Sequence, residues 1–101
     1  MTLIVAGTVR VAPEKLEALR PHAIDMIRAT RQEHGCIAYA FSDDLAQPGL
    51  IHIFEIWRDE EALKAHGASE HMKVWRAAAG ALGVADRQLK TYEIASEKVR
   101  P

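Results

Sequence analysis

Two short stretches, Glu33–Tyr39 (EHGCIAY) and Phe54–Asp59 (FEIWRD), decide the fold of this chain. In the first, a helix ends and a strand begins. In the second, a strand ends and Asp59, a favoured N-cap residue, begins a helix. Between them, Asp43–Gly49 is a polar turn that closes with Pro-Gly. This order predicts a β-hairpin that is entered from one helix and left through another.

Hydrophobic periodicity predicts the remaining elements. Pro13 opens a long helix whose apolar residues recur every three or four positions. We expect Pro21 to kink or interrupt this helix and Gly35 to end it as a left-handed cap. After the hairpin, one short helix runs to His66, Gly67 breaks it, and a second runs from Ser69 to about Ala79. The predicted strands are Leu3–Val11, Cys36–Ser42, Leu50–Arg58 and Gln88–Ala95.

The element order is therefore β-α-β-β-α-β, an α+β fold of the ferredoxin-like split type. We expect one domain over residues 1–101, with a charged tail from about residue 96. Helices cover one face of such a sheet, yet Leu50–Arg58 is apolar on both faces. An uncovered apolar face usually marks an interface. The sequence therefore predicts a homodimer that is formed through the sheet faces.

Composition excludes several classes of protein. The 101 residues carry a net charge of -1 and no basic run, which argues against a nucleic-acid partner. No apolar run approaches the ~18 residues that span a membrane, and the N-terminus lacks the basic region of a signal peptide. Cys36 is the single cysteine, which fits a reducing compartment. We therefore expect a cytoplasmic protein.

The motifs also carry a family resemblance. With the spacing seen here, Gly-Cys-x-x-Tyr and Glu-x-Trp resemble the antibiotic biosynthesis monooxygenase (ABM) family, and the likeness extends from about Leu3 to Ile94. The residues that carry it are Glu33, His34, Gly35, Cys36, Tyr39, Asp43, Phe54, Glu55, Ile56, Trp57, Ala62, Leu63, His66, Ser69 and His71.

The resemblance implies a dimeric α+β barrel with a cavity between the sheet and the helices of each subunit. It also implies one of several activities: oxygenation of phenols and quinols without a cofactor, haem degradation, or isomerisation of small molecules. The haem-degrading branch needs an Asn, a Trp and a His at positions where this chain has Gly7 or Thr8, His66, and Trp75 or Arg76. We therefore expect no haem, and O₂ with a small molecule as the reactants.

Oxygenation without a cofactor needs a base that deprotonates the substrate, and histidine suits this role. His66 and His71 are the candidate catalytic residues. The competing structural interpretations are a helix-terminal histidine for His66 and a partly buried, hydrogen-bonded one for His71. The two are five residues apart and do not share one helical face. No pair of residues has a metal-ligand spacing, so we expect no metal.

The candidate substrate-binding residues are Tyr39, Trp57, His52, Trp75 and Arg76. Aromatic rings would stack on a flat substrate, whereas core packing is the competing interpretation for Trp57. Glu55 needs a partner, and we expect a structural ion pair with Arg58, Arg10 or Lys90. Three functions stay open: a monooxygenase acting on a small aromatic, phenolic or quinol substrate; an isomerase; and a ligand-binding dimer without turnover.

Overall fold

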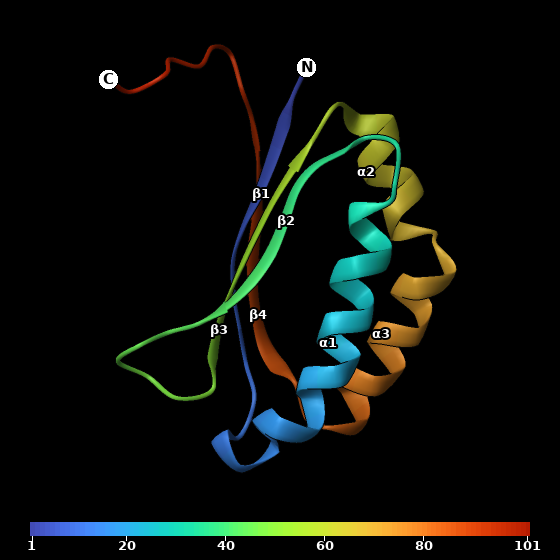
Figure 1. The fold of residues 1–101 in the computed structure, drawn as a ribbon, viewed down its shortest axis with the longest axis vertical. Helices are drawn as coiled ribbons and strands as arrows, with labels where there is room; N and C mark the ends of the chain where they lie inside the picture. The colour runs from blue at the N-terminus through green and yellow to red at the C-terminus, as the bar shows by residue number, and fades with distance from the viewer.

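The structure, a computed structural model, describes all 101 residues. Four strands form one sheet, three helices lie beside it, and a short 3₁₀ turn precedes the first helix (Figure 1). The elements are β1 (Leu3–Arg10), the 3₁₀ turn (Pro13–Lys15), α1 (Leu16–Arg31), β2 (Cys36–Asp43), β3 (Leu50–Trp57), α2 (Glu60–Gly67), α3 (Glu70–Ala81) and β4 (Ala85–Glu93).

The sheet has the strand order β2-β3-β1-β4, and all neighbouring strands are antiparallel. All three helices lie on one side of it (Figure 1). This is the predicted split β-α-β-β-α-β fold, with the second helical segment divided into α2 and α3. The two quoted stretches meet as expected: Tyr39 lies opposite Glu55, and the Gly35 carbonyl accepts a hydrogen bond from the Arg58 N–H at 2.9 Å.

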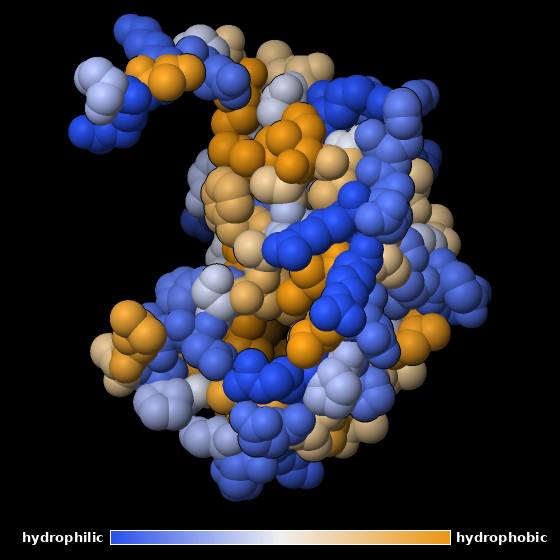
Figure 2. All heavy atoms as spheres, in the orientation of Figure 1, coloured by the Kyte–Doolittle hydropathy of each residue, from blue (hydrophilic) through white to orange (hydrophobic).

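Residues of β3 alternate between the two faces of the sheet, as strand geometry requires. Ile51, Ile53 and Trp57 point toward the helices and are buried, whereas Phe54 on the opposite, open face is 43% exposed. Figure 2 shows hydrophobic side chains gathered over the strands and mostly hydrophilic ones over the outer helical surface. The open face thus keeps the apolar character that the sequence predicts.

Helix α1 is not interrupted at Pro21, which corrects the sequence-based expectation: it runs continuously from Leu16 to Arg31. The proline removes one ladder N–H that would bond the carbonyl of Glu17. Both residues are exposed, so water can hydrate the freed carbonyl. The helix buries Leu19, Met26 and Thr30 against the sheet, and these contacts hold it together across the missing bond.

Two glycines serve close packing. Gly35 was expected to adopt a left-handed cap conformation, which is wrong, because its φ is not positive and the helix ends earlier, at Arg31. A Cβ there would lie 2.2 Å from the Cβ of Ala62, so glycine lets the turn approach α2. Gly7 gives similar room, since a Cβ would lie 1.8 Å from the carbonyl oxygen of Gln88 in β4.

Helices α2 and α3 begin with the predicted caps. The Asp59 side chain accepts from the Ala62 N–H, and the Ser69 side chain accepts from the Met72 N–H. The helical conformation breaks between the two helices, so His66 lies in the last turn of α2 and His71 in the first turn of α3. None of the helices has the length and apolar character needed to cross a lipid bilayer.

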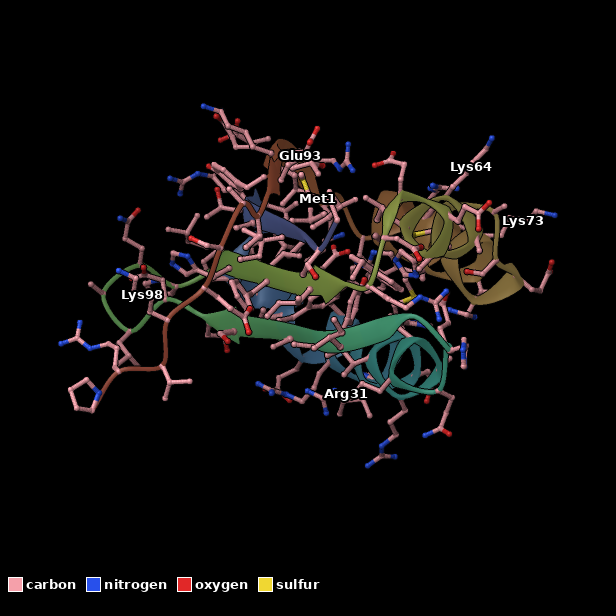
Figure 3. All side chains as sticks on the ribbon, turned by 90° about the horizontal axis from the view of Figure 1, so that it is seen from above. Met1, Arg31, Lys64, Lys73, Glu93 and Lys98 are labelled. Carbon is pink, nitrogen blue, oxygen red and sulfur yellow. The ribbon has the colours of Figure 1, made fainter.

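The last strand starts earlier than predicted. β4 covers Ala85–Glu93 where we expected Gln88–Ala95. The first residues of β4 include the polar Asp86 and Arg87, so a hydrophobicity pattern does not detect the start of the strand. Its backbone nevertheless pairs with β1 up to Arg10. After Glu93 the chain has no helix or strand, and it extends along the open side of the sheet past Lys98 (Figures 1 and 3).

Candidate functional site

A cavity of about 400 Å³ lies between the covered face of the sheet and α3. Three aromatic rings form its walls: Phe41 lies 5.3 Å, centroid to centroid, from both Tyr39 and Trp75. One acidic and two basic side chains also reach it, those of Glu55, Arg76 and Arg87. An apolar hollow of this volume with a few polar groups has the character of a small-molecule site.

Glu55 is the buried carboxylate of this cavity. Its Oε1 accepts a hydrogen bond from the Trp57 Nε1–H at 2.8 Å. Burial raises the pKa of the Glu55 carboxyl, while the Trp57 hydrogen bond and the charges of His66 and Arg87 oppose the rise. Desolvation therefore dominates, and the carboxyl holds its proton more tightly than an ordinary glutamate. A buried carboxyl group with a raised pKa that faces a cavity is a candidate for proton transfer.

Within the chain, Glu55 does not form the expected ion pair with Arg10, Arg58 or Lys90. Both arginines pair with neighbouring aspartates instead. Lys90 lies opposite Ala6, on the open side of the sheet, and so points away from the cavity. The carboxylate is held by an indole N–H of its own strand, two residues away, which spacing on one face of a strand allows.

Tyr39 lies between the cavity and the buried side chains of Trp57 and His66. Its pKa is raised, chiefly by burial and next by the charge of Glu55, so its hydroxyl stays protonated at neutral pH. Its ring centroid lies 5.3 Å from that of His66 and 6.3 Å from that of Trp57, both in edge-on contacts. Behind Tyr39, the Cys36 thiol has its pKa raised mainly by burial, as expected of an unreactive cysteine.

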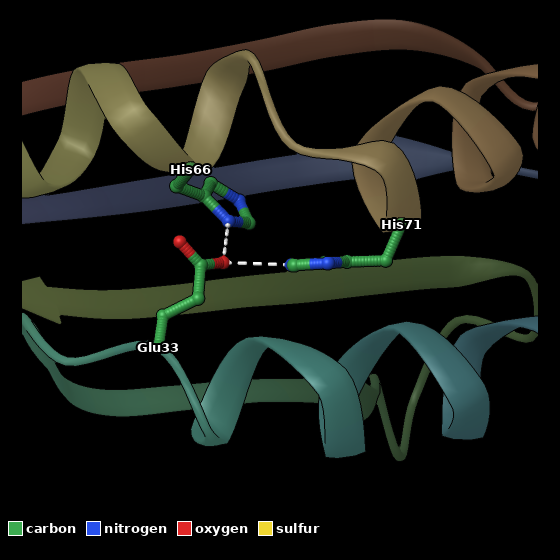
Figure 4. A group of neighbouring side chains, drawn as sticks. All are labelled: Glu33, His66 and His71. Carbon is green, nitrogen blue, oxygen red and sulfur yellow. Dashed lines mark hydrogen bonds and ion pairs between the residues drawn. The ribbon is translucent and has the colours of Figure 1, made fainter.

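Behind this wall, two histidines converge on one carboxylate oxygen (Figure 4). Glu33 Oε2 lies 2.6 Å from His66 Nδ1 and 2.7 Å from His71 Nε2. The side chains of Glu33, His66 and His71 are 17%, 2% and 26% exposed. Their ligand atoms lie within 4.8 Å of one another, close enough to hold a metal ion after small side-chain shifts. His66 Nε2 is buried and has no hydrogen-bond partner.

Three separate segments build this cluster. Glu33 lies in the turn after α1, His66 in the last turn of α2, and His71 in the first turn of α3 (Figure 4). Their spacing of five residues does keep the histidines off a common helical face. It does not keep them apart, because the break at Gly67 lets each approach Glu33 from its own helix.

The structure brings some predicted site residues together and separates others. Tyr39, Trp75 and Arg76 line the cavity. His66 lies behind Tyr39, outside the lining, and His71 lines a second groove of about 420 Å³ between α1 and α3. These are five of the seven predicted residues, on the covered side of the sheet.

Two predicted residues lie elsewhere. Trp57 is completely buried beneath the cavity and bonded to Glu55, so its ring packs in the core. His52 points to the open face, where its Nε2 lies 2.8 Å from Asp44 Oδ2. The structure therefore places His52 across the sheet from every other candidate.

Sequence reasoning missed three residues of the site. Glu33 carried a signal, because an acidic residue just past the C-terminal end of a helix is unfavourable unless something else holds it. Glu55 was considered only as half of an ion pair. Arg87 gave no signal, since the final strand was expected to begin after it. The partners of Glu33 come from segments distant in sequence, whereas Glu55 is held by Trp57 of its own strand.

Comparison with known proteins agrees with this description. The family model described as antibiotic biosynthesis monooxygenase matches residues 2–78. An uncharacterised Synechocystis protein, sll1783, is 30% identical over 93 residues, or 92% of this chain, which spans 63% of that protein's length. YcnE of Bacillus subtilis, provisionally named a monooxygenase, is 25% identical over 70% of this chain and 75% of its own.

A crystal structure gives the same result for the fold. A Deinococcus radiodurans protein, provisionally assigned to the antibiotic biosynthesis monooxygenases, is 33% identical to this chain. The two superpose with a TM-score of 0.87, and the match covers 100% of this chain and 98% of the other. The likeness therefore includes every element that surrounds the cavity.

Proposed function

Because this chain belongs to the antibiotic biosynthesis monooxygenase family, we propose that it oxygenates a small aromatic, phenolic or quinol substrate with O₂, without flavin or metal in the reaction. The observation that carries the proposal is the buried carboxyl group of Glu55 facing a cavity with aromatic walls. In this proposal a flat substrate ring packs against Phe41 and Trp75, with its hydroxyl group directed toward Glu55. Arg76 or Arg87 offers a cation to the oxygen that becomes charged.

The proposed reaction starts with proton transfer. The Glu55 carboxylate takes the phenolic proton, and the electron-rich anion then supplies electrons to O₂, so that no other reductant is needed. In total the substrate loses two hydrogen atoms and gains one oxygen atom, while the second oxygen atom leaves as water. The apolar walls exclude solvent, which strengthens the interaction of the anion with an arginine.

His66 and His71, the bases expected from the sequence, are the competing assignment. They can act only through the Tyr39 layer or from the groove between α1 and α3, since neither lines the main cavity. We favour Glu55 as the base because it is the one carboxyl group that lines the cavity, and burial raises its pKa.

Oxygen uptake with a panel of quinols tests the proposal. A general base contributes about 10²–10⁴-fold to rate, so Glu55→Gln should reduce kcat by at least about 100-fold while the protein stays folded. If His71→Gln loses at least about 100-fold in kcat while Glu55→Gln stays active, the histidines and not Glu55 supply the base. If no quinol or phenol stimulates oxygen uptake, the oxygenase assignment fails.

The same carboxyl could also shuttle a proton within a carbonyl substrate, which is why an isomerase is the second candidate. Isotopically labelled O₂ separates the two, because only an oxygenase transfers the label to the product. Ligand binding that quenches Trp75 fluorescence without any product would leave the third candidate, a binding protein without turnover.

We also propose that the protein is a cytoplasmic homodimer that associates through the open face of the sheet. Phe54 and Tyr92 are 43% and 49% exposed there, and neighbouring Ile4 and Ile56 are only partly buried. Exposed apolar surface of this kind is typical of an interface. Sedimentation should give a dimer at micromolar concentration and a monomer for Phe54→Glu; a wild-type monomer contradicts the proposal.

A further inference from the structure

We propose that Glu33, His66 and His71 form a binding site for a divalent transition-metal ion of the Zn²⁺ and Co²⁺ class. Two imidazole nitrogens and one carboxylate oxygen are a ligand set that such ions take, with positions left open for water. The three residues come from three different segments and present His66 Nδ1, His71 Nε2 and Glu33 Oε2 to one point (Figure 4).

The distances are those of the hydrogen-bonded form, and the two nitrogens lie within 4.8 Å of each other, so metal binding requires the side chains to move. A tetrahedral ion with bonds of about 2.0–2.1 Å holds its ligand atoms about 3.3 Å apart. The two nitrogens now lie 2.6 and 2.7 Å from Glu33 Oε2, so each must withdraw by about 0.6–0.7 Å. Glu33 lies in a turn and His71 is partly exposed, so both side chains have room for this shift.

The tautomers can also change without breaking another bond. In the hydrogen-bonded form, His66 Nδ1 and His71 Nε2 donate to the carboxylate, whereas a metal needs the lone pairs of these same nitrogens. The proton of His66 can move to Nε2, which has no hydrogen-bond partner to lose. His71 is 26% exposed, so its other nitrogen can be reached by solvent.

The surroundings favour a cation. His71 is also part of the groove between α1 and α3, whose other ionisable side chains are His22, Asp25 and Glu70; no lysine or arginine lines it. Lys64 and Lys73, which lie close to the histidines in sequence, point outward from α2 and α3 (Figure 3). Lys73 reaches Glu70 at 3.6 Å, but both side chains are highly exposed. A divalent ion therefore approaches along an acidic path.

The site is distinct from the cavity of the proposed reaction. Neither histidine lines that cavity, and the Tyr39 ring separates it from His66. The metal-site proposal therefore does not depend on the oxygenase proposal.

Titration of the chelator-treated 101-residue chain with Co²⁺ tests the site by visible absorbance. We expect a saturable band with one Co²⁺ per chain, which Zn²⁺ displaces. Glu33→Gln and His71→Gln should each weaken Co²⁺ binding by at least about 10-fold. His52→Gln is the matched control, because His52 and Asp44 also form a histidine–carboxylate contact but have no third ligand. Absence of a saturable band, or equal weakening in His52→Gln, overturns the proposal.

A second measurement uses the unmutated protein, in case a variant does not fold. Imidazole nitrogen NMR should show Zn²⁺ shifting the resonances of His66 Nδ1 and His71 Nε2 while those of His52 stay unchanged. If Zn²⁺ leaves the His66 and His71 resonances in place, the cluster is a hydrogen-bonded network only, and the proposal is wrong.

Discussion

The molecule contains the same chemical contact on both faces of its sheet. On the open face, His52 Nε2 lies 2.8 Å from Asp44 Oδ2, and the two side chains are 50% and 24% exposed. On the covered side, His66 Nδ1 lies 2.6 Å from Glu33 Oε2, with exposures of 2% and 17%. In bond length the two contacts are nearly equal. They differ in burial and in the third partner that only Glu33 has, His71.

This difference separates an exposed ion pair from a structural cluster. If the open-face contact breaks, water replaces either partner at little cost. If the covered contact breaks, His66, whose side chain is 2% exposed, has no water to replace Glu33 and its Nδ1 stays unpaired, which is expensive. The covered histidine also packs against two aromatic rings, those of Tyr39 and Trp57. Burial and the number of partners, and not distance, therefore determine what each contact contributes.

The largest predicted effect is on His66. His66→Ala leaves a void among aromatic rings and removes a buried partner of Glu33, so we expect the free energy of unfolding to fall by about 3–4 kcal/mol. His52→Ala should leave the urea midpoint unchanged. Urea denaturation followed by circular dichroism measures both.

Equal losses in the two variants would contradict the comparison. A loss in His52→Ala that grows as the protein is diluted has a different meaning. It would place His52 in the interface of a dimer, since dimer stability depends on protein concentration. The same pair of variants therefore also examines the open face.

A smaller effect is expected when only the charge of the cluster is removed. Glu33→Gln keeps a carbonyl oxygen that accepts from both imidazoles, but the two hydrogen bonds lose their charge assistance. We expect a loss of about 1–2 kcal/mol at pH 7 in urea denaturation. Asp44→Asn, the matched change on the open face, should lower the urea midpoint by much less than Glu33→Gln does. If Glu33→Gln is as stable as wild type, the cluster holds no net charge-assisted bond.

Glu55 is a second carboxyl group on the covered side of the sheet, and it differs from Glu33 because an indole N–H, and not a histidine, holds it. Its raised pKa means that the folded protein keeps this proton at pH values where the unfolded chain has lost it. Stability therefore falls as pH rises from about 4.5, the ordinary value, through the raised one.

The variant Glu55→Gln removes this slope and should raise the free energy of unfolding at pH 7 by about 0.5–2 kcal/mol, a gain typical of a functional site freed of its strain. Urea titrations across the pH range measure it. Parallel stability–pH curves for wild type and variant would show that Glu55 ionises like an exposed carboxyl.

Sequence alone could predict most of this fold and little of its site. Alternation in Leu50–Trp57, the caps at Asp59 and Ser69, and the break at Gly67 act over a few residues and are readable locally. The errors arose where a distant segment decides the outcome. Gly35 is small because Ala62 packs against it, and Pro21 is tolerated because packing holds its helix.

The site shows the same limit more strongly. His66 and His71 were predicted as candidates, but their common partner Glu33 is 33 and 38 residues away and comes from the turn after α1. No spacing rule links these three residues. The sequence shows that His52 lies on the same face of its strand as Phe54 and Ile56, but it does not show which face the helices cover. That depends on which set of side chains the helices bury.

The smallest predicted effect is on the open-face carboxyl itself. The His52 hydrogen bond, followed by the Ala46 N–H, lowers the pKa of Asp44 below its ordinary 3.8. A carboxyl with a lowered pKa stabilises the fold above its ordinary value, and the contribution disappears as pH falls through the lowered one. In His52→Ala, the pKa of Asp44 measured by carboxyl NMR should move toward 3.8 but stay below it, because the backbone N–H bonds remain. An unchanged pKa would mean that His52 and Asp44 are not paired in solution, and the open face would then hold only two separate polar side chains.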